Sequence, residues 1–122
     1  MKKNFALKNL FFLFSLLLVT LVITLSGCAN VGKNFTYNGP TDIELKKTTK
    51  NEILNKFGSP FRVGYNNGDI QWTYSYYQYS AFADTNTKDL IVSFNKDGIV
   101  DHYEYNSSFE DDKVKILANS SK

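Results

Sequence analysis

The sequence predicts an α+β domain of two layers, in which two N-terminal helices pack on a three-stranded antiparallel β-meander. Two S/T-x-x-E sequences, which favour helix N-termini, occur at 41–44 and 49–52. After Pro60, apolar residues recur at every second position, as they do in strands. Turn sequences rich in Asn, Asp and Gly separate these strands. We assign this domain to residues 41–105.

Residues 1–27 have the organisation of a secretory signal peptide. The flank before residue 9 holds three lysines and no acidic residue, and an apolar run follows over 10–25. This run is shorter than the roughly 20 residues that a membrane-spanning helix needs, and it ends in small residues instead of a basic flank. We therefore expect export, with cleavage between Gly27 and Cys28.

Cys28 is the only cysteine, which excludes an internal disulfide and a multi-cysteine metal site. Residues 28–40 are polar and rich in Gly and Asn, so they are expected to form a flexible tether. Three of the 14 Lys and Arg residues but none of the 12 acidic residues precede Cys28, which leaves the mature chain with a formal charge of −1. No basic surplus points to a nucleic-acid partner.

The two capping sequences begin the helical layer. The first opens a short turn or helix that carries Ile43. The second, at Thr49, opens a helix over Lys50–Phe57, which Gly58 and Pro60 bring to an end. Because the apolar residues of this helix recur at helical spacing, they are expected to face the sheet.

The strands follow in the second half of the domain. We expect a short edge strand at 61–65 and longer strands at 70–79, 90–94 and 99–105, with a polar loop at 81–88 and a frayed tail at 106–122. The core residues predicted from both periodicities are Ile53, Leu54, Phe57, Trp72, Tyr74, Leu90, Val92 and Phe94.

An excess of aromatic residues marks a candidate binding surface. Tyr77 and Tyr79 fall on the strand face opposite Trp72 and Tyr74, and Phe82 begins the following loop. Tyrosine is favoured at interfaces because it buries a large area and keeps a hydroxyl group. One interpretation is that these three residues dock a protein or a partner close to peptidoglycan. The other is that they cover a second apolar cluster with the tether or the tail.

The sequence offers little material for catalysis. His102 is the only histidine, and strand alternation predicts that its neighbour Asp101 points to the opposite face. Metalloprotease, P-loop and nucleophile-elbow motifs do not occur. We therefore expect a protein that is not an enzyme and that takes no metal, cofactor or small-molecule substrate. A hydrolase with an unrecognised site is the disfavoured alternative.

The sequence Leu-Ser-Gly-Cys at 25–28 resembles the lipobox of bacterial lipoproteins. In that family the cysteine thiol receives a diacylglyceryl group and the new amino terminus is often acylated, commonly with palmitate. The resemblance implies that Cys28 carries these chains and anchors the protein to a membrane. Ala29, in place of an aspartate, implies the periplasmic face of the outer membrane, or the outer face of the plasma membrane in a Gram-positive source.

From Ile43 to Tyr105 the chain resembles the SmpA/OmlA lipoprotein family, which includes BamE. The shared features are Thr49, the helix ending in Gly58-Ser59-Pro60, the strand with Trp72, and Phe94 followed by Gly98. The resemblance implies two helices on a three-stranded sheet, a plan shared with the β-lactamase inhibitor protein. It also implies a non-enzymatic scaffold with a protein partner in the cell envelope, in outer-membrane protein assembly or envelope integrity. An inhibitor or accessory module with another envelope partner is the alternative.

Overall fold

The computed structural model describes residues 2–24 and 28–120. Its elements along the chain are α1 (Lys2–Thr24), β1 (Ala29–Gly32), α2 (Lys50–Phe57), β2 (Arg62–Asn66), β3 (Asp69–Tyr79), β4 (Asn86–Phe94), β5 (Val100–Ser107) and α3 (Glu110–Ser120). The α+β class is confirmed, but the details of the predicted architecture differ. Three helices and five antiparallel strands are described in place of two helices on a three-stranded meander.

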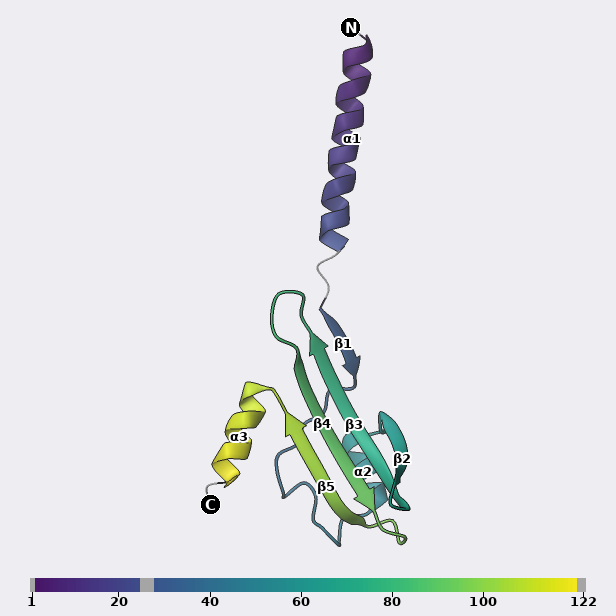
Figure 1. Ribbon diagram of the computed structural model, residues 1–122, viewed down its shortest axis with the longest axis vertical. Helices are drawn as coiled ribbons and strands as arrows, with labels where there is room; N and C mark the ends of the chain where they lie inside the picture. The colour runs from purple at the N-terminus through teal and green to yellow at the C-terminus, as the bar shows by residue number, and fades with distance from the viewer. Residues whose placement is uncertain (1, 25–27, 121–122) are drawn as a thin grey trace.

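The sheet is built around β3, which is long enough to pair with two short strands along one edge. β2 lies beside its first half, where Arg62 pairs with Thr73, and β1 lies beside its end, where Ala29 pairs with Tyr79. The other edge of β3 pairs with β4, and β4 pairs with β5 (Figure 1). The meander was predicted because its turns are local, whereas β1 joins the sheet from a segment more distant in the sequence.

Helix α2 has the capping box that the sequence predicts. The Thr49 amide donates to Glu52 Oε2 over 2.7 Å, and the Glu52 amide donates to Thr49 Oγ1 over 3.3 Å. At the other end, Gly58 has a φ of 79° and its amide donates to the Leu54 carbonyl over 2.8 Å. These bonds satisfy backbone groups that helix ends leave free.

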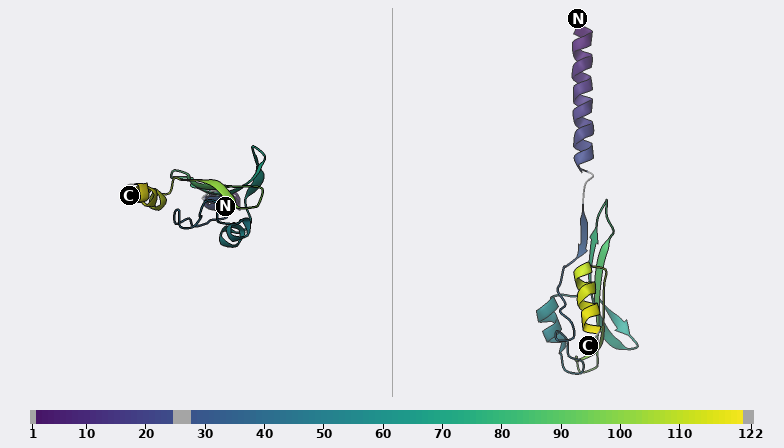
Figure 2. Two further views of the ribbon diagram at one scale, coloured as in Figure 1. Left: turned by 90° about the horizontal axis from the view of Figure 1, so that it is seen from below. Right: turned by 90° about the vertical axis from the view of Figure 1, so that its left-hand side faces the viewer.

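The core lies between α2 and one face of the sheet (Figure 2). The predicted core residues that are buried are Ile53, Phe57, Tyr74, Leu90, Val92 and Phe94. Trp72 is half-buried at the edge of the core, against the ring of Phe94. Leu54 was wrongly placed in the core, because it is 39% exposed. Ile53 and Phe57, four positions apart, occupy the inward face of α2, and Leu54 lies about 100° around the helix from Ile53.

Residues 33–48, here called the core strap, differ most from the sequence prediction. Phe35 and Tyr37 are each only 8% exposed, in the segment predicted to be a flexible tether. The Phe35 ring lies 6.1 Å from the Phe57 ring, and the Tyr37 ring lies 4.5 Å from that of Tyr105. The 28–40 tether is therefore a wrong prediction, because its alternating aromatic residues bury their rings and β1 pairs with β3.

The first predicted helix is replaced by turns. Residues 46–50 pair instead with the start of β5. The Lys46 amide donates to the Val100 carbonyl, and the Val100 amide donates to the Thr48 carbonyl, each over 2.8 Å. A helix at this point would have to give up these bonds to β5. The core strap therefore completes the layer on which a second helix was expected.

The frayed tail predicted for 106–122 is also wrong in its described part. β5 continues to Ser107, Phe109 packs against the core, and α3 covers Glu110–Ser120. Asp112 attaches α3 to the sheet, since it accepts hydrogen bonds from the Tyr105 hydroxyl over 2.7 Å and the Ser107 hydroxyl over 2.8 Å. The three acidic residues in the first turn of α3 also suit the positive end of a helix dipole.

Candidate binding surface on the open face of the sheet

The face of the sheet turned away from α2 is covered by no described helix (Figures 1 and 2). Its centre combines small polar residues with the half-buried Ile91, and Ser75 and Ser93 are almost fully buried among their neighbours. Gln71 Nε2 donates to Ser93 Oγ over 3.2 Å, and the Ser75 hydroxyl donates to Asp89. The polar side chains Gln71, Ser75, Asp89 and Ser93 at the centre of this open face therefore hydrogen-bond to one another within the sheet.

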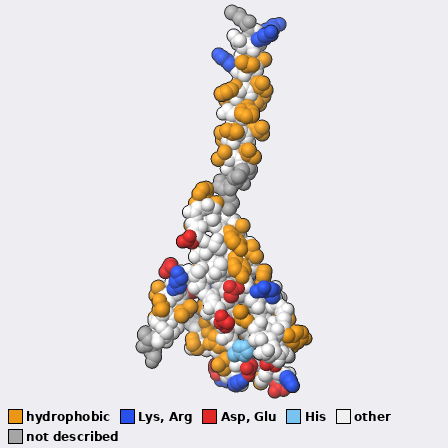
Figure 3. Space-filling view, viewed as in Figure 1, with side chains coloured by type: hydrophobic (Ala, Val, Ile, Leu, Met, Phe, Trp, Pro, Cys, Tyr) orange, Lys and Arg blue, Asp and Glu red, His pale blue; other side chains and the backbone are white. Residues whose placement is uncertain are grey.

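Two tyrosines rise from the open face near the end of β3. The rings of Tyr77 and Tyr79 stack with centroids 6.4 Å apart and planes 20° apart. Tyr77 pairs with Val31 of β1 across the sheet, and Tyr79 and Val31 are 45% and 41% exposed. We call these three residues the aromatic ridge. In Figure 3 hydrophobic side chains gather over this part of β1 and β3.

One member of the ridge, Tyr77, is held in a fixed orientation. The Tyr77 hydroxyl donates to Asp89 Oδ1 over 3.1 Å, and the same carboxylate accepts the Ser75 hydroxyl. A side chain that is already positioned loses less conformational entropy when a partner binds. The ridge thus combines exposed apolar area with preorganised polar groups.

Phe82 lies apart from the ridge. It belongs to the loop between β3 and β4, beyond the last pair of the two strands, Gln78 with Asn86, and it is 92% exposed. The structure therefore brings Tyr77 and Tyr79 together but places Phe82 at the end of the sheet. The alternative interpretation holds in part, because Val31, within the predicted 28–40 tether, pairs with Tyr77. The tail helix α3 lies beside the sheet and does not cover its open face (Figures 1 and 2).

The predicted lipidation site lies at this same end of the sheet. Cys28 is exposed and immediately precedes β1, whose first residue, Ala29, pairs with Tyr79. Gly27, on the other side of the predicted cleavage point, lies outside the described residues. The lipidation itself stays a prediction from the sequence.

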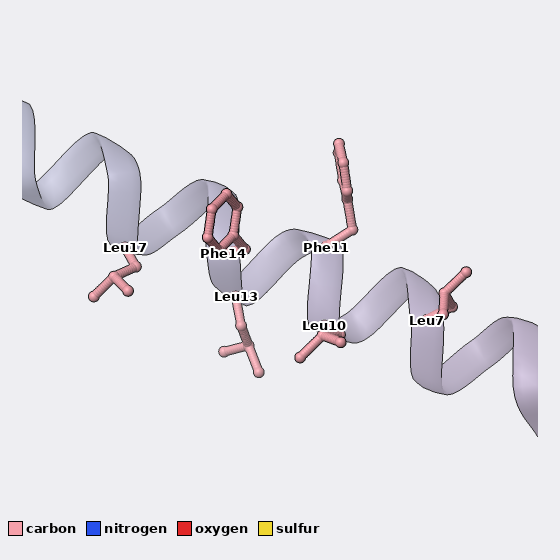
Figure 4. A pocket seen from close by; sticks show the side chains of 6 residues that line it. All are labelled: Leu7, Leu10, Phe11, Leu13, Phe14 and Leu17. Atoms are coloured by element: carbon pink, nitrogen blue, oxygen red, sulfur yellow. The ribbon is translucent and has the colours of Figure 1, made fainter.

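Helix α1 is exposed and apolar around its circumference. Among the described residues, Lys2–Val22 is long and apolar enough to cross a membrane, a property that signal sequences share. A hollow of about 510 Å³ runs along it, lined by Leu7, Leu10, Phe11, Leu13, Phe14 and Leu17 (Figure 4). Because all of these side chains come from one helix, the hollow is a groove between exposed residues and not an enclosed binding cavity.

Comparison with known protein families identifies the family to which the domain is similar in sequence. The sequence pattern of the outer membrane protein assembly factor BamE domain matches residues 43–104, half of the chain. The chain belongs to the BamE family. A comparison with curated proteins gave no significant match.

The BamE match includes Tyr77, Tyr79 and Phe82 but begins at Ile43. The family is defined by outer-membrane protein assembly factors, so a general role of that kind and an association with the outer membrane follow from membership. β1 and the first part of the core strap lie outside the matched region, as does α3. The burial of Phe35 and the pairing of β1 are thus features of this chain that the family match does not describe.

The BamE-family domain has one arrangement that superficially resembles a hydrolase site. A register shift after Ser93 makes Asp101 the extra residue of a β-bulge, so the predicted alternation fails there. His102 Nδ1 lies 3.3 Å from Asp101 Oδ2, and His102 pairs with Ser93. However, Ser93 is fully buried and its oxygen accepts a bond from Gln71. A buried hydroxyl cannot reach a substrate, so the three residues do not form a nucleophilic triad.

A buried lysine, Lys88, was not among the core or site residues predicted from the sequence. Lys88 on β4 is 9% exposed and lies 5.1 Å from the centre of the Phe35 ring and 5.3 Å from that of Phe109. Its ammonium donates to the Phe35 carbonyl, and burial lowers the pKa of its amine. The rings compensate part of the lost hydration through cation–π attraction. Lys88 thus joins the core strap, β4 and the segment before α3, a structural role without a local sequence signal.

Proposed function

We propose that this BamE-family protein is a non-enzymatic scaffold lipoprotein that binds a protein partner in the cell envelope through its aromatic ridge. Acyl chains on Cys28 hold it at the periplasmic face of the outer membrane. The observation that carries the proposal is the stacked pair of the exposed Tyr79 and the half-buried Tyr77, whose hydroxyl is held by Asp89, on a sheet face that no described helix covers.

Aromatic anchors with neighbouring polar groups are the residues that contribute most to protein–protein affinity. The open face meets both conditions, because Val31 and Tyr79 add apolar area beside the Tyr77–Asp89 hydrogen bond. Family membership supports a partner within the outer-membrane assembly machinery. The formal charge of −1 on the mature chain gives no reason to expect a nucleic acid as partner.

The binding surface is tested by partner recovery from detergent-solubilised membranes. The double variant Tyr77→Ala, Tyr79→Ala should lower partner affinity by about 30-fold or more, since each anchor contributes roughly 1–2 kcal/mol. Tyr65→Ala is the matched control, because Tyr65 is 78% exposed on β2, at the other end of β3. Equal recovery with the double variant and the wild type would disprove the proposed surface.

The anchor is tested separately. Mass spectrometry of the N-terminal peptide should find the chain cut before Cys28 and carrying a diacylglyceryl group. The Cys28→Ser variant has no thiol to modify, so its N-terminal peptide should carry no diacylglyceryl group and no acylated protein should be recovered with the membranes. An unmodified thiol at Cys28 in the mature protein would refute the anchoring, whatever the result for the aromatic ridge.

A further inference from the structure

The structure leaves almost no free chain between the proposed lipid site and the sheet. Cys28 is followed directly by Ala29, and β1 pairs with β3 through four residues, from Ala29–Tyr79 to Gly32–Tyr76. Gly32 fixes the end of this pairing, because its φ is 81° and an added Cβ would lie 2.0 Å from the Ser75 carbonyl oxygen. Acyl chains on Cys28 would therefore be attached to the sheet itself.

This attachment determines which end of the domain faces the bilayer. β1 leads away from Cys28, and β3 runs antiparallel to it, so the end of β3 lies next to the lipid site. Paired residues in antiparallel strands have Cα atoms roughly 5 Å apart, and the three residues from Tyr79 to Phe82 span at most about 10 Å. The β3–β4 loop extends toward the same end as α1 and the start of β1, which Cys28 immediately precedes (Figure 1).

The composition of this loop suits the boundary between headgroups and acyl chains. Ala81, Phe82 and Ala83 are all exposed, and Phe82 is the most exposed large apolar residue of the domain, at 92%. An exposed aromatic ring is hydrated unfavourably. Its transfer from water into a membrane interface lowers the free energy because it buries apolar area. Asp84 is the only charge in the loop, so attraction to anionic lipids does not contribute.

We infer that the tip of the β3–β4 hairpin, through Phe82, inserts into the interface of the bilayer that holds the acyl chains of Cys28. The inference rests on the proposed anchoring. The inserted tip gives the domain a second contact with the lipid and fixes its orientation, with β3 directed toward the membrane. The aromatic ridge then lies close to the bilayer surface, where it meets a partner that is itself at the membrane.

The test uses the lipidated protein reconstituted in phosphatidylcholine vesicles whose acyl chains are brominated near the glycerol end. A tryptophan is added at the tip in Phe82→Trp and on β2, beside the start of β3, in Tyr65→Trp, both at strongly exposed positions. Wild type supplies the baseline from Trp72. We expect the bromines to quench the added emission of Phe82→Trp by about two-fold or more and to leave that of Tyr65→Trp unchanged. Added salt should not change this result, because no charge attraction is involved.

If the emission of Phe82→Trp is the same in brominated as in ordinary vesicles, as expected for Tyr65→Trp, the inference is overturned. The mass of the N-terminal peptide, measured on the same samples, separates this outcome from failure of the anchor. Acylated protein without quenching of Phe82→Trp refutes the insertion and leaves the proposed function intact. Protein without acyl chains refutes the anchoring, and with it the insertion. Thermal unfolding of both variants should match wild type, since neither side chain packs in the core.

Discussion

The two faces of the sheet are built for different tasks. On the covered face, Tyr74, Leu90 and Phe94 are buried beneath α2 and the core strap. On the open face, serines lie near the centre, and Tyr79 and Val31 of the aromatic ridge are exposed at one end. Alternation along β3 creates both surfaces from one strand. Substitutions on the covered face should therefore reduce stability, whereas substitutions on the ridge should reduce binding.

The largest loss of stability is expected from Phe35→Ala, which removes the ring that the core strap places against Phe57 and Tyr74. Truncating a buried Phe costs about 3–5 kcal/mol in unfolding free energy. Phe61→Ala is the control, because Phe61 is 48% exposed and should lose under about 1 kcal/mol. Urea unfolding measures both. Similar losses would mean that the core strap does not complete the covered face.

Gly32→Ala should have the next largest effect, about 2 kcal/mol or more, because the new methyl group meets the Ser75 carbonyl and the backbone has a positive φ. Gly64→Ala in β2 has nothing within 4 Å of the added Cβ and serves as the control. Amide hydrogen exchange should show loss of protection in β1 for Gly32→Ala only. Retained protection there would show that β1 does not depend on this close approach.

Asp42→Asn should cost about 1–2 kcal/mol near neutral pH. The Asp42 carboxylate is 8% exposed and accepts bonds from Lys56 Nζ over 2.6 Å and from the Asn38 amide over 2.8 Å. Burial acts to raise the pKa of Asp42, but the bonds from Lys56 and Asn38 outweigh it and the pKa is lowered.

The lowered pKa gives Asp42 a characteristic pH dependence. The ionised carboxylate contributes stability at pH values above about 4, the range of an unfolded Asp, and this contribution disappears as the pH falls through the lower folded pKa. The wild type should thus lose its advantage over Asp42→Asn in melting temperature between neutral pH and about pH 2. A difference that stays constant with pH would contradict this role of Asp42. Glu110→Gln, which removes an exposed ion pair with Lys113, should change little at either pH.

The smallest change in stability should come from the open face. Tyr77→Ala, Tyr79→Ala is expected to lower the unfolding free energy by about 1 kcal/mol, mainly through loss of the Tyr77–Asp89 hydrogen bond, because Tyr79 is already 45% exposed. Its effect should instead appear in partner recovery. A large fall in melting temperature would mean that the ridge belongs to the fold rather than to a binding surface.

Features that depend on near neighbours were predictable. The capping box of α2 joins residues three positions apart, and the turn at Asn67-Gly68 has the positive φ values that its sequence favours. The buried apolar positions of β4 were predicted correctly from the period-two spacing of these residues. The prediction for Asp101 failed where a β-bulge interrupts that alternation, and a bulge has no sequence signal of its own here.

The sequence by itself determined the apolar segment before Cys28, the limits of α2 and the alternation that separates the two faces of β3 and β4. Only the tertiary structure decided that Phe35 and Tyr37 complete the core, that β1 and β2 share one edge of β3, and that α3 is attached through Asp112. The first group arises from contacts within a few residues along the chain. The second depends on rings and backbone groups from distant segments, such as Phe57, Tyr74 and Tyr105 around Phe35, which become neighbours only once the chain has folded.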